Sequence, residues 1–103
     1  MSREYIAVVL EEMPLTLREL ALSCAVSEDW IIEHVRAGVL AAPPEGDPAQ
    51  WRFPDPVLRR TRRLLALERD FDANPELAGL VADLLEELER LRIRLRRAGL
   101  SSD

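Results

Sequence analysis

Hydrophobic and polar residues recur at helical spacing soon after Pro14, and they predict a first short helix. Leu17, Leu20 and Ala21 share one face of that helix. Thr16 and Glu19 have the spacing of a capping box, in which each residue satisfies a free backbone N–H through the other's side chain. The helix is therefore expected to begin just after Thr16.

A second helix is predicted after a connection of only three residues, 24–26. Ser27 suits its N-cap and Gly38 the position just beyond its end. On a helical wheel, one side carries the residues expected in the core: Trp30, Ile31, His34 and Val35. The opposite side carries Glu28, Asp29, Ile32, Glu33 and Arg36.

The segments that flank this helix pair predict a small β component. The run 5–10 is β-branched and aromatic, which favours a short strand. Residues 41–51 are rich in Pro, Gly and Asp, and they separate Val39–Leu40 from Trp51–Phe53, which predicts a small hairpin or wing. The expected fold is mainly α: a winged helix-turn-helix with a short N-terminal strand, a small wing and a C-terminal dimerising helix.

The second half of the chain predicts two longer helices. Asp55 followed by Pro56, and Asn74 followed by Pro75, each have the form of an N-cap with proline at the first helical position. The buried face of the first of these helices is expected to hold Val57, Leu58, Thr61, Leu64 and Leu65. The opposite side is expected to carry Arg59, Arg60, Arg62 and Arg63, either solvated beside nearby acids or available to phosphates.

The last helix has apolar residues at alternating spacings of four and three, which is a heptad seam. The predicted dimer seam consists of Leu77, Val81, Leu84, Leu88, Leu91 and Leu95. Glu87 and Arg92 fall at flanking positions that pair across a parallel dimer, but the sequence leaves the direction open. Packing of the seam within the monomer, over the first and third helices, is the alternative. The expected organisation is 1–54, 55–73, 74–99 and a frayed 100–103.

The distribution of charge opposes the usual role of this layout. The net charge is −5, and all of the excess acid lies in residues 1–54. DNA-binding proteins draw much of their affinity from Lys and Arg against phosphates, yet the helix expected to enter a groove begins with Glu28 and Asp29. DNA and anionic membranes are therefore unfavoured as partners.

Other function classes lack a supporting motif. No nucleophile–base order, phosphate loop or pair of catalytic carboxylates is evident, so no enzyme activity and no cofactor are expected. His34 is the only histidine and Cys24 the only cysteine, so no metal site is expected. A single cysteine, no long apolar run and no signal-peptide pattern favour a cytoplasmic protein without a membrane span.

The order and spacing of several short runs resemble the N-terminal domain of MerR-type regulators. The runs are Leu17–Ala21, Val26–Ser27, Ile31, Arg36–Leu40 and Trp51–Phe53. Together with the acidic balance and the leucine-rich last helix, they make the chain similar to the chaperone-modulator family CbpM over about residues 4–98. That resemblance implies a small dimeric protein that binds the J-domain of a DnaJ-like co-chaperone and inhibits its work with Hsp70.

The resemblance suggests a role for the acidic side of the second helix. J-domains contact Hsp70 through a positively charged helix, and an acidic, partly apolar face suits such a partner. The hypothetical partner-binding residues are Glu28, Asp29, Ile32 and Glu33. A purely structural interpretation also exists, because carboxylates in the first turn of a helix stabilise it in any protein.

Two other functions stay open at this stage. A divergent MerR-type DNA-binding transcriptional regulator would use Arg18, Arg36, Arg52 and the Arg59–Arg63 cluster. A coiled-coil adaptor would need only residues 74–98.

Overall fold

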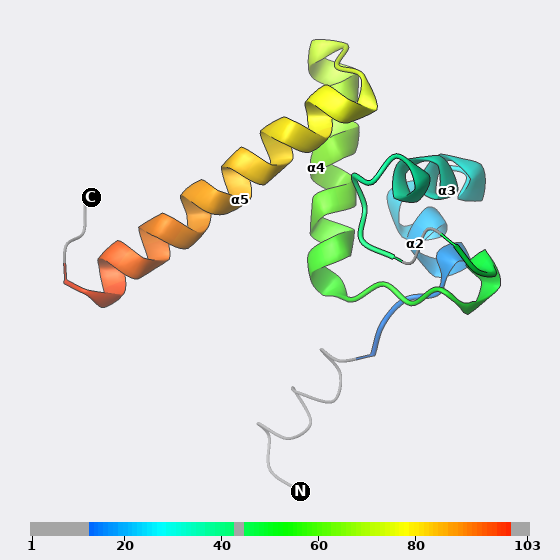
Figure 1. The fold of residues 1–103 in the computed structure, drawn as a ribbon, viewed down its shortest axis with the longest axis horizontal. Coiled ribbons are helices and arrows are strands. Elements are labelled where there is room, and N and C mark those ends of the chain that lie inside the picture. The colour runs from blue at the N-terminus through cyan, green and yellow to red at the C-terminus, as the bar shows by residue number, and fades with distance from the viewer. Residues whose placement is uncertain (1–12, 43–44, 100–103) are drawn as a thin grey trace, which may run out of the picture.

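The computed structural model describes residues 13–42 and 45–99, and in them the protein is mainly α-helical. Figure 1 shows a compact group of helices from which the last helix departs. The elements, in chain order, are α2 (Leu17–Cys24), α3 (Glu28–Arg36), the short 3₁₀ helix η1 (Pro48–Gln50), α4 (Asp55–Phe71) and α5 (Pro75–Arg97). The predicted strand at 5–10 lies outside the described residues.

The ends of α2 and α3 follow the local signals in the sequence. Thr16 Oγ1 accepts a hydrogen bond from the Glu19 amide at 3.1 Å, and Glu19 Oε1 accepts one from the Thr16 amide at 2.9 Å. The bond from the Thr16 amide holds the pKa of the Glu19 carboxyl below its usual value. Ala25, at φ 57°, ends α2, and Ser27 caps α3 through the Trp30 amide. The predicted capping box and N-cap are confirmed.

The core lies among α2, α3, α4 and the segment that precedes α4. Leu20, Ile31, Phe53 and Leu64 are completely buried there. Trp51 is also buried and meets Phe53 edge-on, with ring centroids 6.1 Å apart. The aromatic residues that follow the turn-rich segment therefore return to the core.

The predicted wing is wrong. Val39 and Leu40 do not extend as a strand, because both of their amides donate to the His34 carbonyl and hold them against the end of α3. Phe53 instead forms an isolated antiparallel bridge with Leu15, through two hydrogen bonds of 2.8 Å. Gly38, at φ +82°, makes the reversal that directs the chain back. No strand forms between residues 13 and 42 or between 45 and 99.

The starts of the two long helices differ in how they are capped. Pro54, not Asp55, is the N-cap of α4, and no side chain caps it; Asp55 is already the first helical residue. At α5 the prediction is correct, since Asn74 Oδ1 accepts from the Leu77 amide at 2.8 Å. Asp72, at φ 53°, ends α4 and begins the turn between the two helices.

Helix α5 crosses α4 with its N-terminal half, and its C-terminal half projects away from the other helices (Figure 1). Small residues make the crossing close: Ala78, Gly79 and Ala82 are buried. At Gly79 an added Cβ would lie 2.6 Å from Val39 Cγ1, so only glycine fits this approach. No helix in the described part of the chain is long and apolar enough to cross a membrane.

Candidate protein-interaction surfaces

Helix α3 presents opposite faces to the core and to solvent, as its sequence predicts. Ile31, His34 and Val35 are buried, and Trp30 is half-buried against the core. Glu28, Asp29 and Glu33 are exposed. In the described part of the molecule, none of these three carboxylates has an ion-pair partner, so their charge is available at the surface.

Ile32 is not the outward residue that the helical wheel predicts. It is half-buried and packs against the edge of the core. A groove of about 400 Å³ runs beside it, between α3, the start of α2 and η1. Its lining is acidic and apolar with one arginine: Thr16, Leu17, Arg18, Glu28, Ile32, Asp47, Pro48 and Ala49. A helical wheel describes α3 alone, so it does not reveal this groove, which α2 and η1 complete.

His34 is a structural residue that joins α3 to α4. Its Nδ1 lies 2.7 Å from the Trp30 carbonyl oxygen, and its Nε2 lies 2.7 Å from Glu68 Oε2. The carbonyl can only accept, so Nδ1 donates to it. The ring also stacks on Trp30 at 3.5 Å. Both nitrogens are therefore occupied within the protein.

The described residues offer no metal centre, since no three His, Cys, Asp or Glu side chains come together among them. Cys24 is half-buried at the end of α2, and its burial raises the pKa of the thiol. That shift disfavours the reactive thiolate.

The predicted dimer seam lies on the open side of α5. Of its members, Val81 is half-buried, whereas the leucines are exposed by 42 to 62%: Leu77, Leu84, Leu88, Leu91 and Leu95. The helix packs on α4 through the opposite side, where Ala78, Gly79 and Ala82 lie. The alternative in which the seam covers the first and third helices is therefore wrong.

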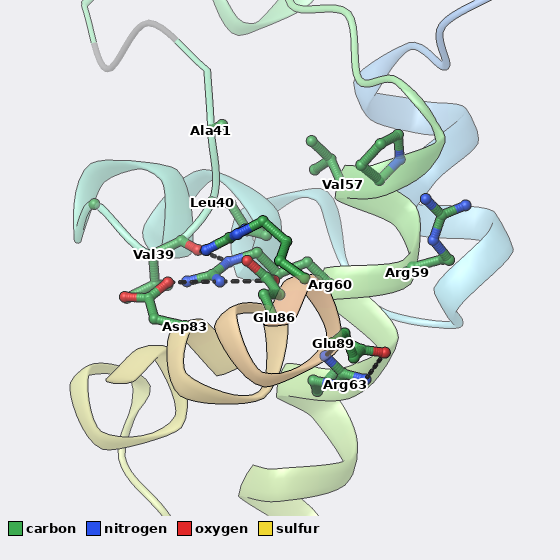
Figure 2. Close-up of a pocket in the computed structure, with 13 residues that line it drawn as sticks. Val39, Leu40, Ala41, Val57, Arg59, Arg60, Arg63, Asp83, Glu86 and Glu89 are labelled. Atoms are coloured by element: carbon green, nitrogen blue, oxygen red, sulfur yellow. Dashed lines mark hydrogen bonds and ion pairs between the residues drawn. The ribbon is translucent and has the colours of Figure 1, made fainter. Parts of the chain in front are cut away.

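Two of the four arginines between residues 59 and 63 are not on a solvated face. Arg60 Nη1 lies 2.8 Å from Asp83 Oδ1 and 2.9 Å from Glu86 Oε2, and its Nε donates to the Val39 carbonyl at 2.7 Å. Arg63 reaches Glu89 at 2.9 Å. Figure 2 shows both guanidinium groups directed at acids of α5. The other two of these four, Arg59 and Arg62, are exposed, as expected.

The Arg63–Glu89 pair changes the titration of both groups. Hydrogen bonding to Arg63 lowers the pKa of Glu89, and the same bond raises the pKa of Arg63. These pairs line a groove of about 630 Å³ between α4, α5 and residues 38–41 (Figure 2). Apart from Arg59, its charged residues are paired inside the chain, so the groove offers less free charge than the α3 face does.

The residues that join α5 to α4 were not identified from the sequence, although a signal for them exists. Ala78, Gly79 and Ala82 are small residues at spacings of one and three, which is the pattern of a close helix crossing. The acids Asp83, Glu86 and Glu89 continue the same side of α5 at spacings of three. The spacing of the leucines identifies only the other face of α5 and gives no indication of this one.

Comparison with known proteins places the chain in a family. A model of the family described as MerR HTH family regulatory protein matches residues 15–98. This range begins near the start of α2 and extends to the end of α5. No solved structure matches the chain significantly.

Similar curated proteins agree on one name. A chaperone modulatory protein CbpM of Pseudomonas entomophila (strain L48) is 33% identical over 78 residues, which is 76% of each chain. Another of that name, from Coxiella burnetii (strain Dugway 5J108-111), is 30% identical over 90 residues, covering 86% of this chain and 83% of the relative. Their name describes a regulatory rather than a catalytic role, and it supports a chaperone-modulating role here. The chain belongs to the CbpM chaperone-modulator family, within the MerR class of helix-turn-helix proteins.

Proposed function

We propose that this protein binds the J-domain of a DnaJ-like co-chaperone and inhibits it by covering the surface that faces Hsp70. The single observation that carries the proposal is the free acidic face of α3. In this family member the helix that would meet DNA presents Glu28, Asp29 and Glu33, all exposed and without ion-pair partners among the described residues.

The chemistry of this face suits a basic protein helix. Three carboxylates on about one and a half turns attract Lys and Arg side chains and favour encounter with a positively charged surface. Half-buried Ile32 and the groove beside η1 add an apolar contact next to the acids. A mixed surface of this kind is typical of protein interfaces, where apolar contacts lie beside polar ones.

The second part of the proposal is that two copies associate through the leucines of α5. Exposed leucines at 77, 84, 88, 91 and 95 form one continuous apolar stripe. A stripe of this length on a single helix is typical of an interface rather than of a solvated surface. Each copy would then present its own α3 face.

The α3 face is tested by measuring J-domain binding calorimetrically. The variant Glu28→Gln/Asp29→Asn/Glu33→Gln keeps side-chain size and removes three charges. We expect its affinity for the J-domain to fall at least about tenfold, because the partner's cations lose their counter-charges. Circular dichroism establishes that the helices are retained.

A matched control removes the same charge elsewhere. Glu45→Gln/Asp55→Asn/Glu76→Gln also takes away exposed carboxylates, and Asp55 and Glu76 lie in the first turns of α4 and α5. The affinity of this control for the J-domain should stay within about twofold of the wild-type value, since only the general charge and the helix-dipole effects change. Equal loss of affinity in both variants would contradict a role for the α3 face.

The DNA-binding alternative is separated by a gel shift on random duplex at low salt. The proposal predicts no shift below micromolar protein, because Arg60 and Arg63 are engaged with acids of α5. Binding with a steep dependence on salt would instead support a transcriptional regulator.

A further inference from the structure

Trp30 lies at the border between the buried side and the acidic side of α3. It packs against the core but is only half-buried, so it keeps some exposed surface. On a helical wheel Trp30 lies about 60° from Glu33, while Ile32 borders the acids on their other side. The acidic face therefore has a half-buried apolar side chain along each of its two edges.

His34 holds the Trp30 ring in place. The two rings stack, with centroids 3.5 Å apart and planes inclined by 19°. The His34 ring is itself fixed, because Nδ1 lies 2.7 Å from the Trp30 carbonyl oxygen and Nε2 lies 2.7 Å from Glu68 Oε2. The indole therefore rests on a fixed ring, so little side-chain entropy is left to lose when a partner binds against it.

The surroundings of Trp30 suit a guanidinium group. Glu33 follows Trp30 by three positions, which places their Cβ atoms about 5–6 Å apart on the helix surface. Its carboxylate is exposed and has no ion-pair partner among the described residues. A tryptophan ring attracts a cation to its face. A guanidinium is planar, so it can stack on the ring and donate to a carboxylate at the same time, whereas the ammonium of lysine has no flat surface to stack.

We infer that Trp30 and Glu33 form a site for one arginine side chain of the partner that α3 binds. The guanidinium lies against the indole and donates to the carboxylate. The inference rests on the binding of a basic protein surface to α3 proposed above, and it specifies one residue that this surface must present. His34 and Glu68 support the site from inside the protein and do not contact the arginine.

A series of substitutions at position 30 tests the contact by calorimetry with the J-domain. Trp30→Phe keeps an aromatic ring, and Trp30→Leu keeps only an apolar side chain. Because tryptophan attracts cations more strongly than phenylalanine does, the affinity should fall about two- to fivefold in the first variant and about tenfold in the second. Circular dichroism establishes that both variants are folded. Equal affinity of all three chains would overturn the inference.

An aromatic residue elsewhere on the surface provides the matched control. Phe71, the last residue of α4, is 75% exposed. Phe71→Leu makes the same type of change as Trp30→Leu, and it should leave the affinity for the J-domain within about twofold of the wild-type value. A loss as large as that of Trp30→Leu would overturn the assignment of the site to Trp30.

A double-mutant cycle tests whether the indole and the carboxylate bind the same group. Glu33→Gln should lower the affinity about five- to tenfold in the wild type, but no more than about twofold once Trp30→Leu is present, because residues that share a partner are not additive. Glu28→Gln changes the far edge of the acidic face, so its effect should be the same in both backgrounds. Additive losses at positions 30 and 33 would overturn the shared site.

The preference for arginine is tested on the partner. Each arginine of the J-domain is changed in turn to lysine, which keeps the charge and removes the planar group. One of these changes should weaken binding to the wild type about fivefold and leave binding to Trp30→Leu unaltered. If no arginine behaves in this way, the site does not recognise arginine and the inference is overturned.

Fluorescence separates failure of this inference from failure of the proposed function. The chain has two tryptophans, so Trp51→Phe leaves Trp30 as the only one. A J-domain without tryptophan should shift the emission of Trp30 to shorter wavelength, because the exposed part of the ring loses water. Absence of binding by calorimetry would overturn the proposed function and this inference with it. Binding with unchanged emission would overturn only the arginine site.

Discussion

The leucines of this protein have opposite surroundings in its two halves. Leu17, Leu20, Leu40 and Leu64, in the helical body, are at most 6% exposed. On α5 the leucines of the stripe are 42% or more exposed, although the helix is just as well formed. A buried leucine in the body stabilises the monomer, whereas an exposed leucine on α5 has no contact to lose until another molecule covers it. Hydrophobic periodicity therefore identifies a face, and only the fold shows whether the same chain covers it.

The largest effect is expected from opening the core of the body. Phe53→Ala removes a completely buried ring that meets Trp51 edge-on, while the backbone bridge to Leu15 is retained. We expect a loss of about 3–5 kcal/mol in the free energy of unfolding, measured in urea, because a cavity remains in a small core. Leu88→Ala on α5 is the matched change. Below the association concentration it should alter stability by no more than about 0.5 kcal/mol, and a larger loss would show that α5 is covered within the monomer.

The joint between the two regions is expected to respond next. Arg60→Met keeps the aliphatic stem but leaves the Val39 carbonyl and the Asp83 and Glu86 carboxylates without their donor. A loss of about 2–3 kcal/mol is expected, because the guanidinium is largely buried and makes several charge-assisted bonds. Arg59→Met, at an exposed neighbour, should change stability by less than about 0.5 kcal/mol. Equal effects would mean that the ion pairs do not fix α5 on α4.

Gly79 tests the same joint through its backbone. Alanine favours a helix by about 1 kcal/mol over glycine, but its Cβ would lie 2.6 Å from Val39 Cγ1. Overpacking costs about 1–3 kcal/mol, so Gly79→Ala should destabilise the wild type by about 1 kcal/mol. In a Val39→Ala background the same change should stabilise the protein, as thermal melts of the four variants would reveal. Stabilisation in both backgrounds would contradict the close crossing.

The smallest effect concerns the dependence of stability on pH. Arg63 holds the pKa of Glu89 below its usual value, so the folded state favours the carboxylate. The stabilisation is present above the unfolded pKa, about 4.3, and is lost as the pH falls through the lower folded value. Glu89→Gln should therefore reduce the melting temperature at pH 6 and have little effect at pH 3. An equal reduction at both values would contradict the ion pair.

The sequence predicts local structure here better than it predicts pairing between segments. The capping box at Thr16, the N-caps at Ser27 and Asn74 and the buried side of α3 all depend on residues a few positions apart, and all are confirmed. The wing fails because Val39 and Leu40 bind the end of α3 while Phe53 pairs with Leu15. The Pro, Gly and Asp residues of 41–51 predict turns, but they do not determine which segment Phe53 pairs with.

The same limit applies to the candidate surfaces. The acidic residues of α3 are recognisable from a helical wheel, because exposure on one helix follows from its own period. The half-burial of Ile32 depends on its packing against the core, and the engagement of Arg60 depends on acids that lie 23 and 26 residues further along the chain. Contacts of this kind arise only when the helices pack.

If α3 binds the partner and α5 joins two copies, the mass of the complex tests this division of roles most directly. Light scattering on mixtures with the J-domain should give two chains with two J-domains for the wild type. Leu84→Gln/Leu88→Gln should give one chain with one J-domain at unchanged affinity, and Glu28→Gln/Asp29→Asn/Glu33→Gln should give two chains alone. Loss of J-domain binding in the α5 variant, or its retention in the α3 variant, would contradict the account.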